Sequence, residues 1–218
     1  MANQSASLRE EAIRLLSDQE YEKSLTVFDF LVRQYEVPQD RVWLGLLQLL
    51  NGDFYGATIE FSAAVAELPQ DLSCHHHLAA IRSSCPVSEL RDAPLAMEHA
   101  EKVADIRQKH SWRSLSVLGA CHAENGDFEI AISRTREAIR ICHMAYRERL
   151  RTRIEAYKLA IPYRMCLSDL RAAAEICEHH CTICGQLKFV IWEQASADYI
   201  PLCLDCATVC DESQLARR

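Results

Sequence analysis

Apolar residues recur along most of the chain at spacings of three, four and seven. Ala57, Phe61 and Ala64 show this pattern, and an equivalent series lies further along the chain. The later series consists of Ala131, Thr135 and Ala138. Such spacings place side chains on one face of a helix rather than on alternating faces of a strand. The pattern therefore predicts a mainly helical chain with an internal repeat.

A four-residue sequence marks the two copies. Asn51-Gly52-Asp53-Phe54 recurs verbatim as Asn125-Gly126-Asp127-Phe128, and Leu44-Gly45 precedes the first copy as Leu118-Gly119 precedes the second. A glycine-containing turn lies between two amphipathic stretches in each copy. Each copy is thus predicted to be a helix–turn–helix unit.

These residues resemble the tetratricopeptide repeat, a unit of two helices joined by a short turn. The matching positions are Leu44, Gly45, Gly52, Phe54, Ala57, Phe61, Ala64 and Pro69. Gln48 departs from the pattern, because the family usually has tyrosine there. The resemblance implies a mainly α fold, a right-handed α-solenoid of helical hairpins.

Weaker units flank the two clear copies. A degenerate hairpin precedes the first, and another, with helices over 72–83 and 93–109, separates the two. Its linker, residues 84–92, is longer than the standard turn and explains why the two clear copies lie more than two repeat periods apart. Asp92 is predicted to cap the helix that follows, because Pro94 lies just inside its start. A last helix over 145–160 is predicted to cap the array with its arginines in solvent. Residues 1–165 then form one helical-repeat domain.

In this family the first helix of each hairpin lines a concave groove, which implies a site for a protein or peptide partner. The candidate groove residues are Val42, Leu46, Leu49, Leu50, His76 and Arg113. An apolar groove suits an amphipathic helix or an extended peptide. The alternative is that the short array folds its own terminal helix into the groove, leaving these leucines as core. The Lys and Asn residues with which relatives capture a C-terminal carboxylate are absent.

Three consecutive histidines, His75-His76-His77, lie within the helix predicted over 72–83. Consecutive helical residues point about 100° apart. Three in a row cannot converge on one metal ion, so we expect surface and groove roles for them.

Cysteine is the unusual feature of the composition, with 11 in 218 residues. Six of them fall between Cys177 and Cys210, and two Cys-x2-Cys pairs there are separated by the stretch 185–202. That spacing matches a four-thiolate zinc site, in which Zn–S distances are about 2.3 Å. The predicted ligands are Cys181, Cys184, Cys203 and Cys206, with Cys177, Cys210 and His180 as further candidates. The other five cysteines are scattered and are predicted to be small packing residues.

The residues between the two pairs favour a β-hairpin. Residues 187–193 are rich in β-branched and aromatic side chains, and 199–202 form a second such stretch. Pairs of cysteines on such a hairpin resemble a zinc ribbon or treble-clef finger, which implies a structural Zn²⁺ in a module over 166–218. Iron in a rubredoxin-like site has the same ligands, but the second pair, Cys203 and Cys206, lacks the flanking Pro and Gly of that family.

Charge argues against nucleic acid as a partner. The formal net charge is −7, and residues 166–218 carry four basic against eight acidic side chains. Binding to phosphate backbones needs the opposite sign. The N-terminal sequence lacks a secretory pattern and no apolar run approaches the length of a membrane span, so we expect a cytoplasmic protein without a membrane partner.

No glycine-rich phosphate loop, nucleophile elbow or zinc-protease helix occurs in the sequence. The sequence therefore predicts a non-enzymatic adaptor with a structural zinc finger. A second interpretation is a zinc- or redox-responsive regulator in which the cysteine cluster acts as the switch.

Overall fold

The computed structural model describes the backbone of residues 2–107, 112–142, 144–167, 170, 176–180, 187–195 and 198–203. Nine α-helices and one 3-10 turn lie within these ranges. The helices are α1 (Ala2–Ser17), α2 (Tyr21–Tyr35), α3 (Pro38–Asn51), α4 (Phe54–Glu67), α5 (Leu72–Ser84), α6 (Ala93–Arg107), α7 (Trp112–Glu124), α8 (Phe128–Ile141) and α9 (Met144–Lys158).

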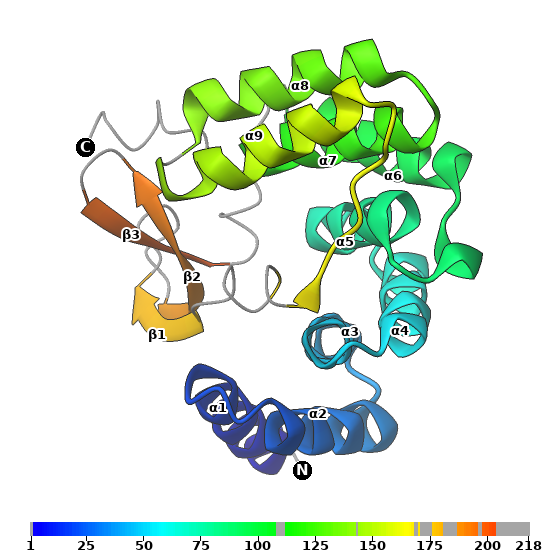
Figure 1. Cartoon of the computed structure of the whole chain (residues 1–218). Coiled ribbons are helices and arrows are strands. Elements are labelled where there is room, and N and C mark those ends of the chain that lie inside the picture. Colours follow the sequence, from blue (N-terminus) through cyan, green and yellow to red (C-terminus); the bar gives the residue numbers. More distant parts are fainter. Residues whose placement is uncertain are drawn as a thin grey trace.

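The first eight helices pair into four hairpins: α1 with α2, α3 with α4, α5 with α6, and α7 with α8. Figure 1 shows that the hairpins follow one another along an arc, from α1 at one end to α8 and α9 at the other. The helical part of the chain is thus a tetratricopeptide-like array of four hairpins followed by one further helix, as the sequence predicts.

Small residues let the two helices of a hairpin approach each other closely. A Cβ atom on Gly45 of α3 would lie 3.0 Å from Cε1 of Phe61 in α4. The equivalent Cβ on Gly119 of α7 would lie 2.7 Å from Oγ1 of Thr135 in α8. Both distances are shorter than ordinary van der Waals contact, so the Leu-Gly pairs mark where each hairpin packs.

The repeated Asn-Gly-Asp-Phe sequence forms the turn of both hairpins. Gly52 and Gly126 have φ of +84° and +90°, a left-handed conformation that glycine adopts without a steric penalty. Asp53 then accepts a hydrogen bond from the backbone N–H of Gly56 at 2.9 Å and so caps the start of α4.

The linker of the third hairpin is ordered. A 3-10 turn over Ser88–Leu90 buries Leu90, and Asp92 accepts a hydrogen bond from the N–H of Leu95 at 3.0 Å at the start of α6. The prediction of a long linker ending at an Asp92 helix cap is confirmed.

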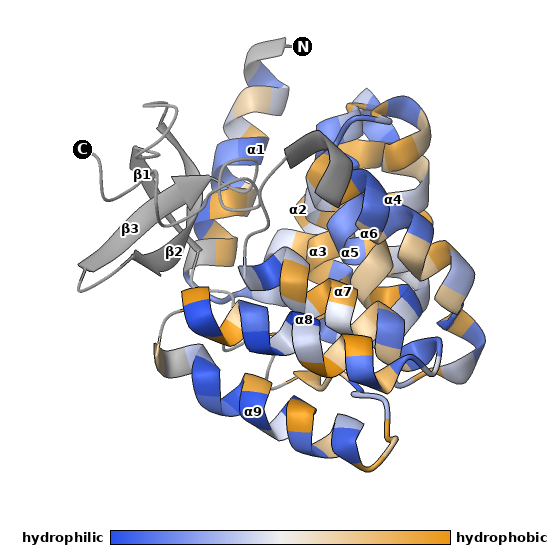
Figure 2. Ribbon diagram, turned by 90° about the horizontal axis from the view of Figure 1, so that it is seen from above, coloured by the Kyte–Doolittle hydropathy of each residue, from blue (hydrophilic) through white to orange (hydrophobic). Residues whose placement is uncertain are grey.

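The core runs between neighbouring hairpins. Phe28, Leu31, Leu47 and Phe61 are fully buried, and hydrophilic and hydrophobic residues alternate along the helices (Figure 2). Burying one such side chain contributes about 1.5–3 kcal/mol.

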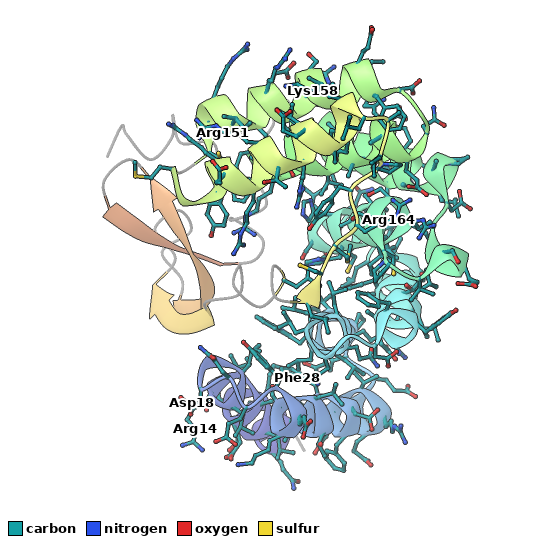
Figure 3. All side chains as sticks on the ribbon, viewed as in Figure 1. Arg14, Asp18, Phe28, Arg151, Lys158 and Arg164 are labelled. Carbon is teal, nitrogen blue, oxygen red and sulfur yellow. The ribbon has the colours of Figure 1, made fainter. Side chains whose placement is uncertain are left out.

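After α9 the chain reverses and runs back along the array as residues 161–167, which we call the return segment (Figure 1). The backbone N–H of Met165 donates to the carbonyl oxygen of Ser84 at 2.8 Å. Arg164 forms an ion pair of 2.6 Å with Glu124 (Figure 3 labels Arg164 beside α5), and Leu167 packs against Gly52. The return segment therefore ties the end of the array to its middle.

Three strands follow: β1 (Ile176–His180), β2 (Leu187–Ala195) and β3 (Asp198–Cys203). They form an antiparallel sheet in the order β1-β2-β3, and β1 lies against α1. The two stretches predicted as strands fall within β2 and β3. Of the predicted metal ligands and further candidates, Cys181, Cys184, Cys206 and Cys210 lie outside the described residues.

Candidate functional site

A cavity of about 200 Å³ lies where the first helices of three hairpins, α3, α5 and α7, face α9 and the return segment. Its lining comprises Leu46, Leu49, Leu50, His76, His77, Ala80, Ser84, Trp112, Arg113, Ser116, Val117, Ala120, Tyr146, Arg149, Leu150, Arg153, Tyr163, Met165 and Leu170. This is the face that the repeat pattern assigns to the groove, and we call it the concave groove.

The structure brings most of the predicted groove residues together. The residues that line the cavity are Leu46, Leu49, Leu50, His76 and Arg113. Val42 does not line it, since it is buried in the core between hairpins. Five of the six predicted groove residues therefore line the cavity, and Val42 lies one helical turn before the others on α3.

The three leucines of α3 are largely covered, because each is less than a tenth exposed. The chain itself provides part of the cover. Tyr163 and Met165 of the return segment line the cavity, as does Leu170. The alternative stated above is met in part: the terminal helix α9 faces the groove, and the non-helical return segment, which was not predicted, covers another part of it. The cavity is the part that they leave unfilled.

The arginines of α9 match the prediction in part. Arg149 and Arg151 are exposed, as expected, whereas Arg147 and Arg153 are half-buried; Arg149 and Arg153 line the cavity. Nη1 of Arg153 donates to Oγ of Ser116 at 2.6 Å, and its guanidinium lies 3.8 Å from the centre of the Tyr163 ring. The cause is the buried face of α9, which contains Leu150, Ile154 and Tyr157. Arg153 adjoins this face, so its side chain also lies against the groove.

Aromatic rings form one wall. The rings of Trp112 and Tyr146 stack with centroids 4.6 Å apart, and the guanidinium of Arg113 lies 4.9 Å from the Trp112 ring centre. The groove thus presents apolar side chains, flat aromatic surfaces and guanidinium groups within one enclosure.

The three histidines point in different directions, as expected for consecutive helical residues. His76 and His77 line the cavity, but the expected surface or groove role is wrong for His75, which is buried against His99 of α6. Desolvation, reinforced by the charge of Arg113, lowers the pKa of His77 to about 4, so this ring is neutral at pH 7. Among the described residues no three potential ligands of the His, Cys, Asp and Glu types are grouped for a metal ion.

Four of the five scattered cysteines are packing residues, as predicted. Cys74, Cys85, Cys121 and Cys142 are buried, whereas Cys166 is exposed; none of the five forms a disulfide. Burial raises the pKa of Cys121 to about 12. The Cys121 thiol is therefore protonated and unreactive at neutral pH.

The sheet fixes the backbone positions of three candidate zinc ligands. Cys177 of β1 and Cys203 of β3 both pair with Val190 of the central strand. His180 ends β1 opposite Leu187, the first residue of β2. β3 runs antiparallel to β2, so its last residue, Cys203, lies toward that same end of the sheet.

Comparison with known proteins shows likeness at the level of fold. No protein-family model matches the chain, and no curated protein matches it. MamA (residues 41 to the end) from Desulfovibrio magneticus RS-1 is 17% identical, with a TM-score of 0.56 over 72% of this chain and 88% of that one. The MamA RS-1 ArsTM double mutant is 15% identical, with a TM-score of 0.53 over 77% of this chain and 94% of that one.

A thermophilic tetratricopeptide-repeat protein of Thermus thermophilus, TTC0263, is 16% identical over 71% of this chain and 99% of that one, with a TM-score of only 0.41. In the described part of the chain, no helix combines the length and apolar character that crossing a membrane requires.

Proposed function

We propose that this protein is a non-enzymatic adaptor that binds a peptide or short helix of a protein partner in the concave groove. The observation that carries the proposal is the cavity between α3, α5, α7, α9 and the return segment. Concave, mainly apolar enclosures with a few fixed polar groups are the usual geometry of binding sites. A helical groove of this kind takes a peptide through apolar anchors.

Selection of peptides from a random displayed library on the full-length protein tests this proposal. We expect selected peptides to lose at least about tenfold in affinity when Ala80→Phe fills the cavity. The matched control is Ile59→Glu, on the outer face of α4, where Ile59 is 66% exposed. Equal loss with both variants, or none with Ala80→Phe, would place binding elsewhere. Thermal melting monitored by circular dichroism checks that both variants fold.

The second part of the proposal is a structural zinc site formed by Cys181, Cys184, Cys203 and Cys206. Sheet topology supports it. The first pair lies in the connection that leaves β1 at His180 and enters β2 at Leu187. Cys203 ends β3 toward the same end of the sheet, and Cys206 follows shortly after it in the sequence. Four thiolates in a closed site suit Zn²⁺.

Elemental analysis of the purified protein tests the zinc site. We expect about one zinc per chain, which Cys184→Ser removes and Cys166→Ser, outside the cluster, retains. A full complement of zinc in Cys184→Ser would rule out this ligand set. Peptide affinity measured with and without a chelator distinguishes the two interpretations, because a purely structural finger leaves the groove affinity unchanged and a zinc-responsive regulator does not.

A further inference from the structure

We propose that the concave groove selects an acidic side chain, an internal Glu or Asp of the partner peptide flanked by bulky apolar residues. This inference rests on the proposed function and specifies the chemistry of its ligand. The occupant is identified by charge complementarity between the groove and the peptide.

The described lining of the cavity is cationic, although the whole chain has a formal charge of −7. It contains Arg113, Arg149 and Arg153 and no Asp or Glu. His77 adds no charge at neutral pH, because its pKa lies at about 4. The positive charge of the groove therefore comes from guanidinium groups and persists across the physiological pH range.

Of these arginines, Arg153 is the one on which the inference depends. Its Nη1 binds the hydroxyl of Ser116 and its plane covers the Tyr163 ring. Its Nε is buried and has no hydrogen-bond partner among the described residues. A hydroxyl and an aromatic face hold the side chain in position but do not neutralise it.

Four other half-buried arginines of the chain are neutralised, whereas Arg82 donates to the carbonyl oxygen of Leu90. Those that form ion pairs with carboxylates are Arg9 with Asp40, Arg41 with Glu60, and both Arg91 and Arg164 with Glu124. Holding a cation away from water without a counter-charge is unfavourable, and binding of a carboxylate relieves that cost. Guanidinium and carboxylate also match in shape, since two parallel N–H groups can donate to the two oxygens.

The remainder of the lining determines what surrounds the carboxylate. Leu46, Leu49, Val117, Leu150 and Met165 offer apolar contacts around the arginines. The volume of about 200 Å³ exceeds the roughly 150 Å³ cavity that admits benzene, so a complete side chain can enter. An acidic residue with bulky apolar neighbours can therefore contact both the arginines and the apolar side chains of the groove.

Fluorescence anisotropy with four matched pools of labelled nonapeptides tests the proposal on the full-length protein. Three pools carry the fixed centre Leu-Glu-Leu, Leu-Gln-Leu or Leu-phosphoserine-Leu and an amidated C-terminus. The fourth carries Leu-Gln-Leu and a free C-terminal carboxylate. We expect the Glu pool to bind at least about tenfold more tightly than each of the others.

Two arginine variants on the same helix complete the experiment. We expect Arg153→Gln to reduce the preference for Glu over Gln to less than about twofold. Arg151→Gln retains the full preference, because Arg151 is exposed and pairs with Glu148 outside the cavity. A preference that survives Arg153→Gln would overturn the assignment of this residue.

The outcomes separate this inference from the function on which it rests. Equal binding of the Glu and Gln pools, both weakened by Ala80→Phe, would leave the groove as a peptide site and overturn the acidic preference. Tighter binding of the phosphoserine or free-carboxylate pool would also overturn it. Failure of every pool to bind would overturn both proposals.

Discussion

Nδ1 of His75 lies 2.8 Å from Nδ1 of His99, so one of these nitrogens must donate a hydrogen to the other. Nε2 of His75 lies 3.1 Å from the carbonyl oxygen of Pro69, which can only accept. In a neutral pair His75 therefore donates through Nε2 and accepts through Nδ1 from His99. Protonation of both rings would place two N–H groups face to face between α5 and α6.

Acid is expected to destabilise the fold at pH values at which the histidines of the unfolded chain bind protons. Desolvation first, and the neighbouring His75 next, lower the pKa of His99 to about 4. Between pH 6.5 and 4 the unfolded chain binds more protons at this residue than the folded chain. The free energy of unfolding therefore decreases as the pH is lowered through that window. His77 acts in the same direction.

Urea unfolding at pH 7 and pH 4.5 measures this effect. We expect His99→Asn to remove about 1–2 kcal/mol of the pH-dependent loss, because its amide donates in place of Nδ1 and does not titrate. His76→Asn, within the same histidine series, is the control. An unchanged pH profile in His99→Asn would show that the pair does not govern acid stability.

A carboxylate holds the return segment in place. Glu124 accepts from Nε of Arg91 at 2.9 Å and from Nη1 of Arg164 at 2.6 Å. Glu124→Gln leaves two half-buried guanidinium groups without their counter-charge. We expect a loss of about 1–3 kcal/mol in the free energy of unfolding by urea, together with faster proteolytic cleavage within 161–167.

Glu148→Gln provides the comparison, because it breaks an exposed ion pair with Arg151 on α9. That change should cost less than about 0.5 kcal/mol. Similar losses in the two variants would contradict a specific role for Glu124.

The close approach of α7 and α8 is tested by Gly119→Ala. The added Cβ would lie 2.7 Å from Oγ1 of Thr135, so the hairpin must open, at a cost of about 1–3 kcal/mol. Thr135→Ala removes that oxygen. In a double-mutant cycle followed by urea unfolding, we expect the paired changes to cost about 1 kcal/mol less than the sum of the single ones. Additive losses would mean that the contact with Thr135 does not limit the packing.

Thiol reactivity distinguishes the scattered cysteines from one another. Cys166 is exposed, whereas Cys74 and Cys121 are fully buried with pKa values raised chiefly by desolvation. With iodoacetamide at pH 8 and peptide mass spectrometry, we expect Cys166 to react on the order of 100-fold faster than Cys121. Comparable rates would show that α7 opens readily. Denatured protein supplies the reference rate for each site.

Sequence reasoning succeeds where structure is local. The Asn-Gly-Asp-Phe turns, the Asp92 cap and the faces of α3 and α5 follow from dihedral preferences and helical periodicity within a few residues. The same reasoning places Leu46, Leu49 and His76 on the groove side. Each of these predictions depends only on residues within one hairpin.

The return segment and the arginines of the groove depend on tertiary packing. Met165 donates a backbone hydrogen bond to Ser84 at the end of α5, in the third hairpin. No periodic pattern in 161–167 predicts that contact. For Arg153 a local signal exists: Leu150, Ile154 and Tyr157 define the inward face of α9, and Arg153 adjoins it. The position of Ser116, which fixes the guanidinium, follows only from the assembled array.

The path of the return segment also bears on how the array deforms. A helical-repeat arc changes its curvature by small rotations between successive hairpins, each of which contacts only its neighbours. Here residues 161–167 cross the inside of the arc and contact it at Glu124, Ser84 and Gly52. These three contacts fix the distance between α9 and α3. A partner bound in the groove, as we propose, would therefore meet a groove of set width, and no entropy would be lost through straightening or tightening of the arc.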